Sequence, residues 1–83
     1  MKPRRSVFTK KYYPGAIRRW FSGKYHLIVG RETNNEYSRR GLFYIEISDG
    51  QDSLHADTWF QSRREAETEA RRALARIKAG QRP

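Results

Sequence analysis

Cysteine is absent from this 83-residue sequence, which excludes disulfides and cysteine-ligated metals. The two histidines, His26 and His55, are isolated and lack metal-ligand spacing. No apolar stretch approaches the roughly 20 residues that span a bilayer, and no apolar run follows the basic N-terminus as in a secretory signal. We therefore expect a cytoplasmic protein that binds no metal or cofactor and does not interact with membranes.

Recognisable catalytic patterns are also missing. Gly23 and Gly30 are isolated glycines and form no phosphate-binding loop. A metal-dependent nuclease based on Glu46 and Asp57 has no spacing signature to support it. The sequence thus predicts a binding protein without catalytic residues, not an enzyme.

Acidic residues are missing from the first 24 positions, which carry eight Lys and Arg. Positions 25–60 carry three basic and six acidic residues, and positions 61–83 carry seven basic and three acidic residues. The net charge of +9 is therefore concentrated at the N-terminal end of a nearly neutral body. Such a basic segment is typical of proteins that contact nucleic acid or another polyanion.

Residues 62–79 have the pattern of an amphipathic helix. Ser62 and Glu65 form a capping box, and Gly80 is placed to end the helix. The apolar face is formed by Ala66, Ala70, Ala73, Leu74 and Ile77.

The charges of this helix are interpreted mainly as intrahelical ion pairs. Suitable spacing joins Glu67 to Arg71 and Glu69 to Arg72. The alternative is a stripe at seven-residue spacing that meets a phosphate backbone, formed by Arg64, Arg71 and Lys78.

Three runs rich in β-branched and aromatic residues precede the helix and are predicted as strands, at 24–31, 42–48 and 53–60. Turn signals at Asn34-Asn35 and Asp49-Gly50 join them as an antiparallel meander. The expected fold class is α+β, with a three-stranded meander packed on one C-terminal helix.

The middle strand shows how this sheet should pack. Ile45 and Ile47 alternate with Tyr44 and Glu46, so the helix should cover the face that carries the isoleucines. Tyr44, His55 and Trp59 are then expected on the open face. That face either serves as an aromatic docking surface or is covered by the N-terminal segment.

Residues 1–23 are expected to form a basic, aromatic N-terminal arm next to a β-β-β-α domain at 24–80 and a short tail at 81–83. Residues 1–5 are predicted to be disordered. The rest of the arm leaves three alternatives: "SVFTKKYY" (6–13) as a fourth, edge strand, "AIRRWF" (16–21) as a helical turn, or a flexible arm.

The segment "KKYYPGAIRRWF" (10–21) interleaves cations with aromatic rings, which is the combination that binds phosphates and stacks on bases. The rings have an alternative role as a cap on a thin core. The predicted nucleic-acid contacts are Arg4, Arg5, Lys10, Lys11, Tyr12, Tyr13, Arg18, Arg19, Trp20 and Lys24. Secondary contacts are expected at Arg39, Arg40, Tyr44 and Trp59.

Three antiparallel strands followed by a capped helix resemble the AP2-type and integrase amino-terminal DNA-binding domains. The similar segment is "DTWFQSRREAETEARRAL" (57–74). The resemblance implies a sheet that enters the DNA major groove. The open face expected here carries Glu46, His55 and Asp57 where those domains place several arginines, so no DNA-contact residue is transferred.

The leading hypothesis is a small non-enzymatic module that binds DNA or RNA, mainly through phosphate contacts. The alternative is a protein-interaction module or inhibitor, of the kind that phages and mobile elements encode, docking on an acidic partner. Homo-dimerisation is compatible with both hypotheses, since it would stabilise a thin core.

Overall fold

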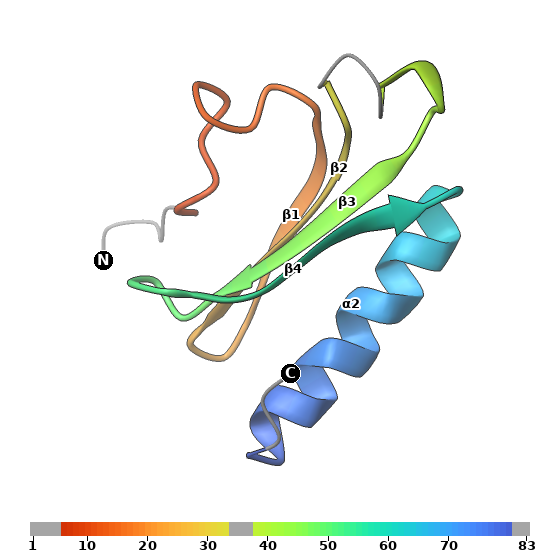
Figure 1. Cartoon of the computed structure of the whole chain (residues 1–83). Helices are drawn as coiled ribbons and strands as arrows, with labels where there is room; N and C mark the ends of the chain where they lie inside the picture. Colours follow the sequence, from red (N-terminus) through yellow and green to blue (C-terminus); the bar gives the residue numbers. More distant parts are fainter. Residues whose placement is uncertain (1–5, 34–37, 81–83) are drawn as a thin grey trace.

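The computed structural model describes residues 6–33 and 38–80, which form one antiparallel sheet and one C-terminal helix (Figure 1). The sheet has four strands in the order β1-β2-β3-β4, so each strand pairs with its neighbour in sequence. The strands are β1 (Ala16–Ser22), β2 (Tyr25–Arg31), β3 (Phe43–Ser48) and β4 (Ser53–Phe60). The expected α+β meander with a C-terminal helix is confirmed.

Strand β1 comes from the segment that the sequence pattern left open. Ala16–Ser22 forms a strand and not a helical turn, and it pairs with β2 through a two-residue loop at Gly23 and Lys24. Gly23 has a φ of 59°, which a glycine adopts without steric cost. The four-stranded alternative is therefore the observed one, but its extra strand is 16–22 instead of 6–13. The boundary expected between residues 23 and 24 falls inside this hairpin.

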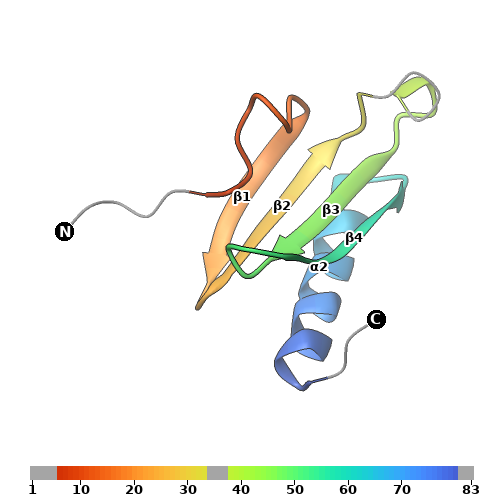
Figure 2. The same cartoon turned by 60° about the vertical axis from the view of Figure 1, so that its left-hand side comes forward.

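Helix α2 (Arg63–Lys78) covers one face of the sheet, as Figure 2 shows. The Ser62 side chain accepts a hydrogen bond from the Glu65 backbone N–H at 3.1 Å, which confirms the N-cap. The buried side chains on the helix are the five predicted from its apolar periodicity. They pack on sheet residues Leu27, Val29, Ile45, Ile47 and Phe60. Four of these five sheet residues are leucine, isoleucine or valine, and three of the five helix residues are alanine. Because alanine is small, the helix and the sheet can approach each other closely.

The opposite face of the sheet is partly covered by residues 6–15 (Figures 1 and 2). Ile28 lies between Leu27 and Val29 in β2, so its side chain points away from the helix, yet it is fully buried. Phe8 is 1% exposed and lies outside the helix-side core. Its ring packs edge-on against Tyr13 with 5.0 Å between centroids. Of the two alternatives for the open face, coverage by the N-terminal segment is the one observed over this part of the sheet.

Strand β4 departs from the simple alternation expected for it. Its pairing with β3 is irregular between Phe43 and Ile45 and again between Ile47 and Ser48. His55 consequently pairs with Ile47, whose side chain belongs to the helix-side core. The expectation that His55 lies on the open face is wrong, because bulges shift the faces of the strand. The same register sets Asp57 opposite Ile45, so Asp57 is not on the open face of the strand either, although it lines the pocket described below along the edge strand β4.

Three expectations fall outside the described residues: disorder at 1–5, the Asn34-Asn35 turn and the tail at 81–83. The Asp49-Gly50 turn is present and is closed by backbone N–H groups of Gln51 and Asp52 donating to the Asp49 carboxylate. Over the described part of the chain, no helix combines the length and apolar character needed to span a bilayer.

Candidate functional site

Cations from β1 and from α2 meet along one side of the molecule. The Glu67 carboxylate accepts hydrogen bonds from Arg63 at 3.2 Å and from Arg18 of β1 at 3.5 Å. At the other end of the helix, the Lys78 ammonium donates to the Ser22 hydroxyl of β1 at 2.8 Å. These two contacts fix which side of α2 borders β1.

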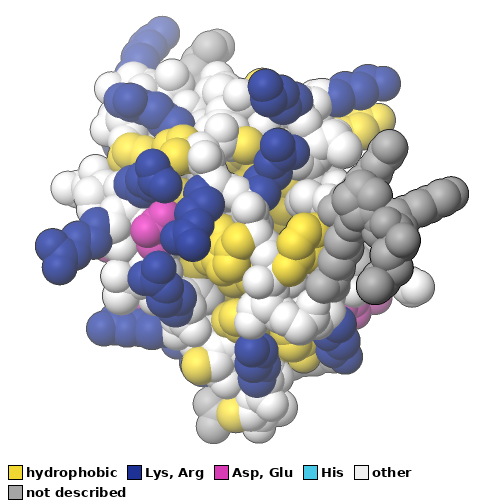
Figure 3. All heavy atoms as spheres, turned by 180° about the vertical axis from the view of Figure 1, so that it is seen from behind, with side chains coloured by type: hydrophobic (Ala, Val, Ile, Leu, Met, Phe, Trp, Pro, Cys, Tyr) yellow, Lys and Arg dark blue, Asp and Glu magenta, His cyan; other side chains and the backbone are white. Residues whose placement is uncertain are grey.

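Arg71 lies on the same side, because it is four residues after Glu67 and seven before Lys78. We call the surface formed by Arg18, Arg63, Arg71 and Lys78 the basic face. Figure 3, which views the molecule from the β1 edge, shows Lys and Arg side chains spread over this side with few carboxylates among them.

The charges of the helix are paired differently from the expectation. Glu67 pairs with Arg63 and Arg18, and Glu69 pairs with Arg76 at 3.0 Å. Within residues 6–33 and 38–80, Arg71 and Arg72 make no ion pair. The expected pair of Glu67 was wrong because one side of the helix faces β1, whose Arg18 side chain reaches Glu67.

Glu67 is the carboxylate that pairs with two cations of the basic face. Partial burial alone would raise the pKa of Glu67, but the hydrogen bonds and charges of Arg63 and Arg18 outweigh burial and lower it below its usual value. Glu67 therefore stays ionised at neutral pH and offsets part of the charge of two arginines. No carboxylate of the described residues pairs with Arg71 or Lys78.

Two of the predicted contact residues, Arg18 and Trp20, lie at this face. The Arg18 guanidinium stacks over the Trp20 ring at 4.6 Å from its centroid. Trp20 itself is partly buried and packs against the helix-side core. Its ring thus positions Arg18 and is not exposed as a stacking platform.

The remaining predicted cations are dispersed. Lys10 and Lys11 are exposed in the turn that Thr9 begins, and Lys24 lies over the Tyr25 ring in the β1–β2 loop. Arg19 points to the face away from the helix, where it donates to the Phe8 carbonyl at 2.8 Å. Arg19 therefore anchors the N-terminal segment and has a structural role.

The last four predicted cationic contacts are Arg39, Arg40, Arg4 and Arg5. Arg39 and Arg40 are exposed at the beginning of the segment that leads to β3. Arg4 and Arg5 lie outside the described residues.

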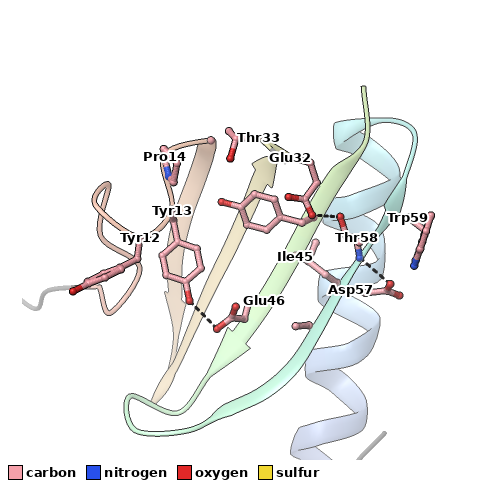
Figure 4. Close-up of a pocket in the computed structure, with 13 residues that line it drawn as sticks. Tyr12, Tyr13, Pro14, Glu32, Thr33, Ile45, Glu46, Asp57, Thr58 and Trp59 are labelled. Carbon is pink, nitrogen blue, oxygen red and sulfur yellow. Dashed lines mark hydrogen bonds between the residues drawn. The ribbon is translucent and has the colours of Figure 1, made fainter. Parts of the chain in front are cut away.

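The face away from the helix holds a pocket of a different character. It lies between residues 12–15 and strands β3 and β4 and has a volume of about 450 Å³ (Figure 4). We call it the aromatic–acidic pocket and define it by Tyr13, Tyr44, Trp59, Glu32, Glu46 and Asp57. Among the residues that the structure describes, neither Lys nor Arg lines it.

Four of the five predicted aromatic contacts line this pocket. Tyr13 and Tyr44 are partly buried, with ring centroids 6.5 Å apart and planes 33° apart. Tyr12 is 72% exposed and Trp59 is 56% exposed, and Figure 4 shows them at opposite ends of the pocket. The structure thus separates these four aromatic residues from the basic face, whereas Trp20 lies at that face beside Arg18.

Each carboxylate of the pocket accepts a hydrogen bond from a neutral donor. Glu46 accepts from the Tyr13 hydroxyl at 3.1 Å, and Glu32 accepts from the Thr58 hydroxyl. Asp57 accepts from the Thr58 backbone N–H at 2.8 Å. Burial and then the nearby Glu32 raise the pKa of Tyr44 to about 12. The pocket thus gathers three carboxylates that have no Lys or Arg partner among the described residues.

Sequence reasoning did not select Arg63 or Glu32 as functional residues. The spacing of Arg71 and Lys78 along the helix is the sequence signal for the basic face. The main interpretation of the helix charges as intrahelical ion pairs hides that signal. Glu32 and Thr58 come together from the ends of distant strands, so no local pattern marks them.

Comparison with protein-family models, with curated proteins and with solved structures found no match to this chain.

Proposed function

We propose that the protein is a small non-enzymatic nucleic-acid-binding module that contacts phosphates through the basic face. The observation that carries the proposal is the separation of charge within one small domain. Four cations gather on the β1–α2 side with one carboxylate among them, whereas the carboxylates Glu32, Glu46 and Asp57 gather in the pocket on the other side of the sheet. A surface of this kind orients a protein toward a polyanion.

The open sheet face is a poor alternative contact for DNA. Residues 6–15 cover part of it, and the remaining pocket is lined by carboxylates. Groove binding through the sheet would bring phosphates toward these carboxylates. This supports a contact through helix and edge strand in place of the sheet contact implied by AP2-type domains.

The proposal gives a quantitative expectation for salt dependence. Each phosphate neutralised on duplex DNA contributes about 0.9 to the slope of log affinity against log salt, and about 0.7 on a single strand. Engagement of all four cations of the basic face corresponds to a duplex slope of about −3.6. Replacing Arg71 and Lys78 together by alanine should lower the magnitude of that slope by about 1.8.

The test is fluorescence anisotropy with labelled duplex DNA and single-stranded RNA at several salt concentrations. The wild type is compared with the double variant Arg71→Ala/Lys78→Ala. The matched control is Arg72→Ala/Arg76→Ala, which removes the same charge from α2 outside the basic face. A third variant, lacking residues 1–5, measures the contribution of the N-terminal cations without removing Phe8.

Micromolar binding whose slope falls in the basic-face variant and not in the control supports the proposal, and the preferred polymer then identifies DNA or RNA. An equal loss in both double variants means that net charge alone governs binding and refutes the assigned face. Absence of binding to either polymer at low salt refutes nucleic acid as the partner. An acidic protein, for which the same cations are suited, is then the next candidate.

A further inference from the structure

The three carboxylates of the aromatic–acidic pocket are unusual in a protein with a net charge of +9. The carboxylates Glu67 and Glu69 of the helix each pair with arginine. In contrast, Glu32, Glu46 and Asp57 pair with no Lys or Arg of the described residues and accept only from hydroxyl or backbone donors. A cation in the pocket would supply the charged partner that the described residues do not give these carboxylates.

The walls of the pocket are suited to an organic cation. Tyr44 and Tyr13 contribute ring surface next to Glu46, and Trp59 contributes an exposed ring at the β4 end. Aromatic faces attract ammonium groups through their quadrupole, by about 0.5–1 kcal/mol at exposed sites and more when the cation is desolvated. The combination of rings and carboxylates thus favours a cation that also has an alkyl part.

The spacing of the carboxylates argues against a metal ion. Among residues 6–33 and 38–80, no three of His, Asp and Glu are close enough together to hold one. A volume of about 450 Å³ is also much larger than a metal site requires. The rings of Tyr13 and Tyr44 already contact each other, which leaves no slot between them for a flat group. A compact, roughly spherical head group suits this arrangement better than a planar one.

We propose that the aromatic–acidic pocket binds an alkylammonium group, with its positive head near Glu32 and Glu46 and its alkyl part against Tyr44 and Trp59. Two sources present this chemistry, a small free amine and a lysine side chain with or without methyl groups. The inference does not depend on nucleic-acid binding, because the pocket and the basic face are formed by different residues on different sides of the sheet.

The test is a titration of the ¹⁵N-labelled protein with choline and with butylammonium, followed by amide chemical-shift changes. The critical comparison uses the neutral alcohol in which a carbon atom replaces the choline nitrogen, since it has the same shape without the charge. Shift changes in β3, β4 and residues 12–15 with choline, and at least fivefold weaker binding of the neutral alcohol, support the proposal. Equal binding of the two compounds, or no shift change in these segments at millimolar ligand, overturns it.

Variants locate the site and check the role of charge. Glu32→Gln and Glu46→Gln keep the size of each side chain and its capacity to accept a hydrogen bond, and each should weaken choline binding by about fivefold. Trp59→Ala should weaken it by about two- to fivefold through loss of apolar contact with the alkyl part. Asp52→Asn removes the same charge at an exposed position outside the pocket and should leave affinity unchanged.

Affinity that falls equally in Asp52→Asn and in the pocket variants refutes the site. A further arm compares butylammonium with short peptides that contain lysine or trimethyllysine. Tighter binding of a peptide than of the free amine identifies a side chain of a partner as the source, and the reverse identifies a small amine. Weak, equal binding of every cation to all variants indicates general charge attraction and overturns the proposal.

Discussion

Replacing Phe8 by alanine should destabilise the protein by about 3 kcal/mol, the lower end of the range for a buried Phe→Ala change. The Phe8 side chain is 1% exposed, so the change removes the whole of its buried surface. The edge-on contact with Tyr13 is lost as well, which accounts for about 0.5–1.5 kcal/mol of the total. The Arg19 hydrogen bond reaches the Phe8 backbone carbonyl and survives in the variant, which limits the loss.

Urea denaturation followed by far-ultraviolet circular dichroism measures this change. Tyr12→Ala, four positions away, is the control, because Tyr12 is 72% exposed and its loss should change the free energy of unfolding by less than about 0.5 kcal/mol. A change of less than about 1 kcal/mol for Phe8→Ala would show that residues 6–15 are not packed on the sheet, and the description of that face would then be refuted.

Two further predictions concern the same face of the sheet. Gly30→Ala should destabilise the fold by about 1–3 kcal/mol in urea denaturation, because the Cβ atom of the new alanine would overlap the ring of Tyr44. A variant as stable as the wild type would mean that the Tyr44 ring lies elsewhere. The raised pKa of Tyr44 favours its neutral form in the folded state, so stability should be constant up to about pH 10 and fall as the pH rises toward 12. An absorbance titration in which Glu32→Gln leaves the Tyr44 pKa unchanged would contradict the proximity of that carboxylate.

The helix was predictable because its determinants are local. Ser62, Glu65 and the spacing of Ala66, Ala70 and Ala73 depend only on neighbouring residues, and each has the predicted role. The meander was predictable for a similar reason, since each strand pairs with the next one in the chain.

The path of residues 6–22 was not predictable, because it depends on surface that exists only after the sheet has formed. Ile28 is apolar on a face that sequence alternation alone leaves open, and its burial requires a segment that is distant in sequence. The apolar side chain of Ile28 indicates that something covers this face, but it does not identify residues 6–15 as the covering segment. Arg19 shows the same limit: its charge suggested a phosphate contact, whereas the folded chain directs it to a backbone carbonyl.

The candidate site was predictable in its chemistry and less so in its location. The excess of cations is a property of composition, but their grouping depends on which side of α2 faces β1, because Glu67 there joins Arg18 to Arg63. This arrangement makes Glu67 a test of the basic face in its own right. Glu67→Gln removes the negative charge between two arginines, so affinity for duplex DNA at low salt should rise by about two- to fivefold, with a loss of stability of less than about 1 kcal/mol. The control is Glu69→Gln, on the other side of the helix, which should have a smaller effect on affinity. If anisotropy titrations show unchanged or weaker binding for a folded Glu67→Gln protein, phosphates do not approach Arg18 and Arg63.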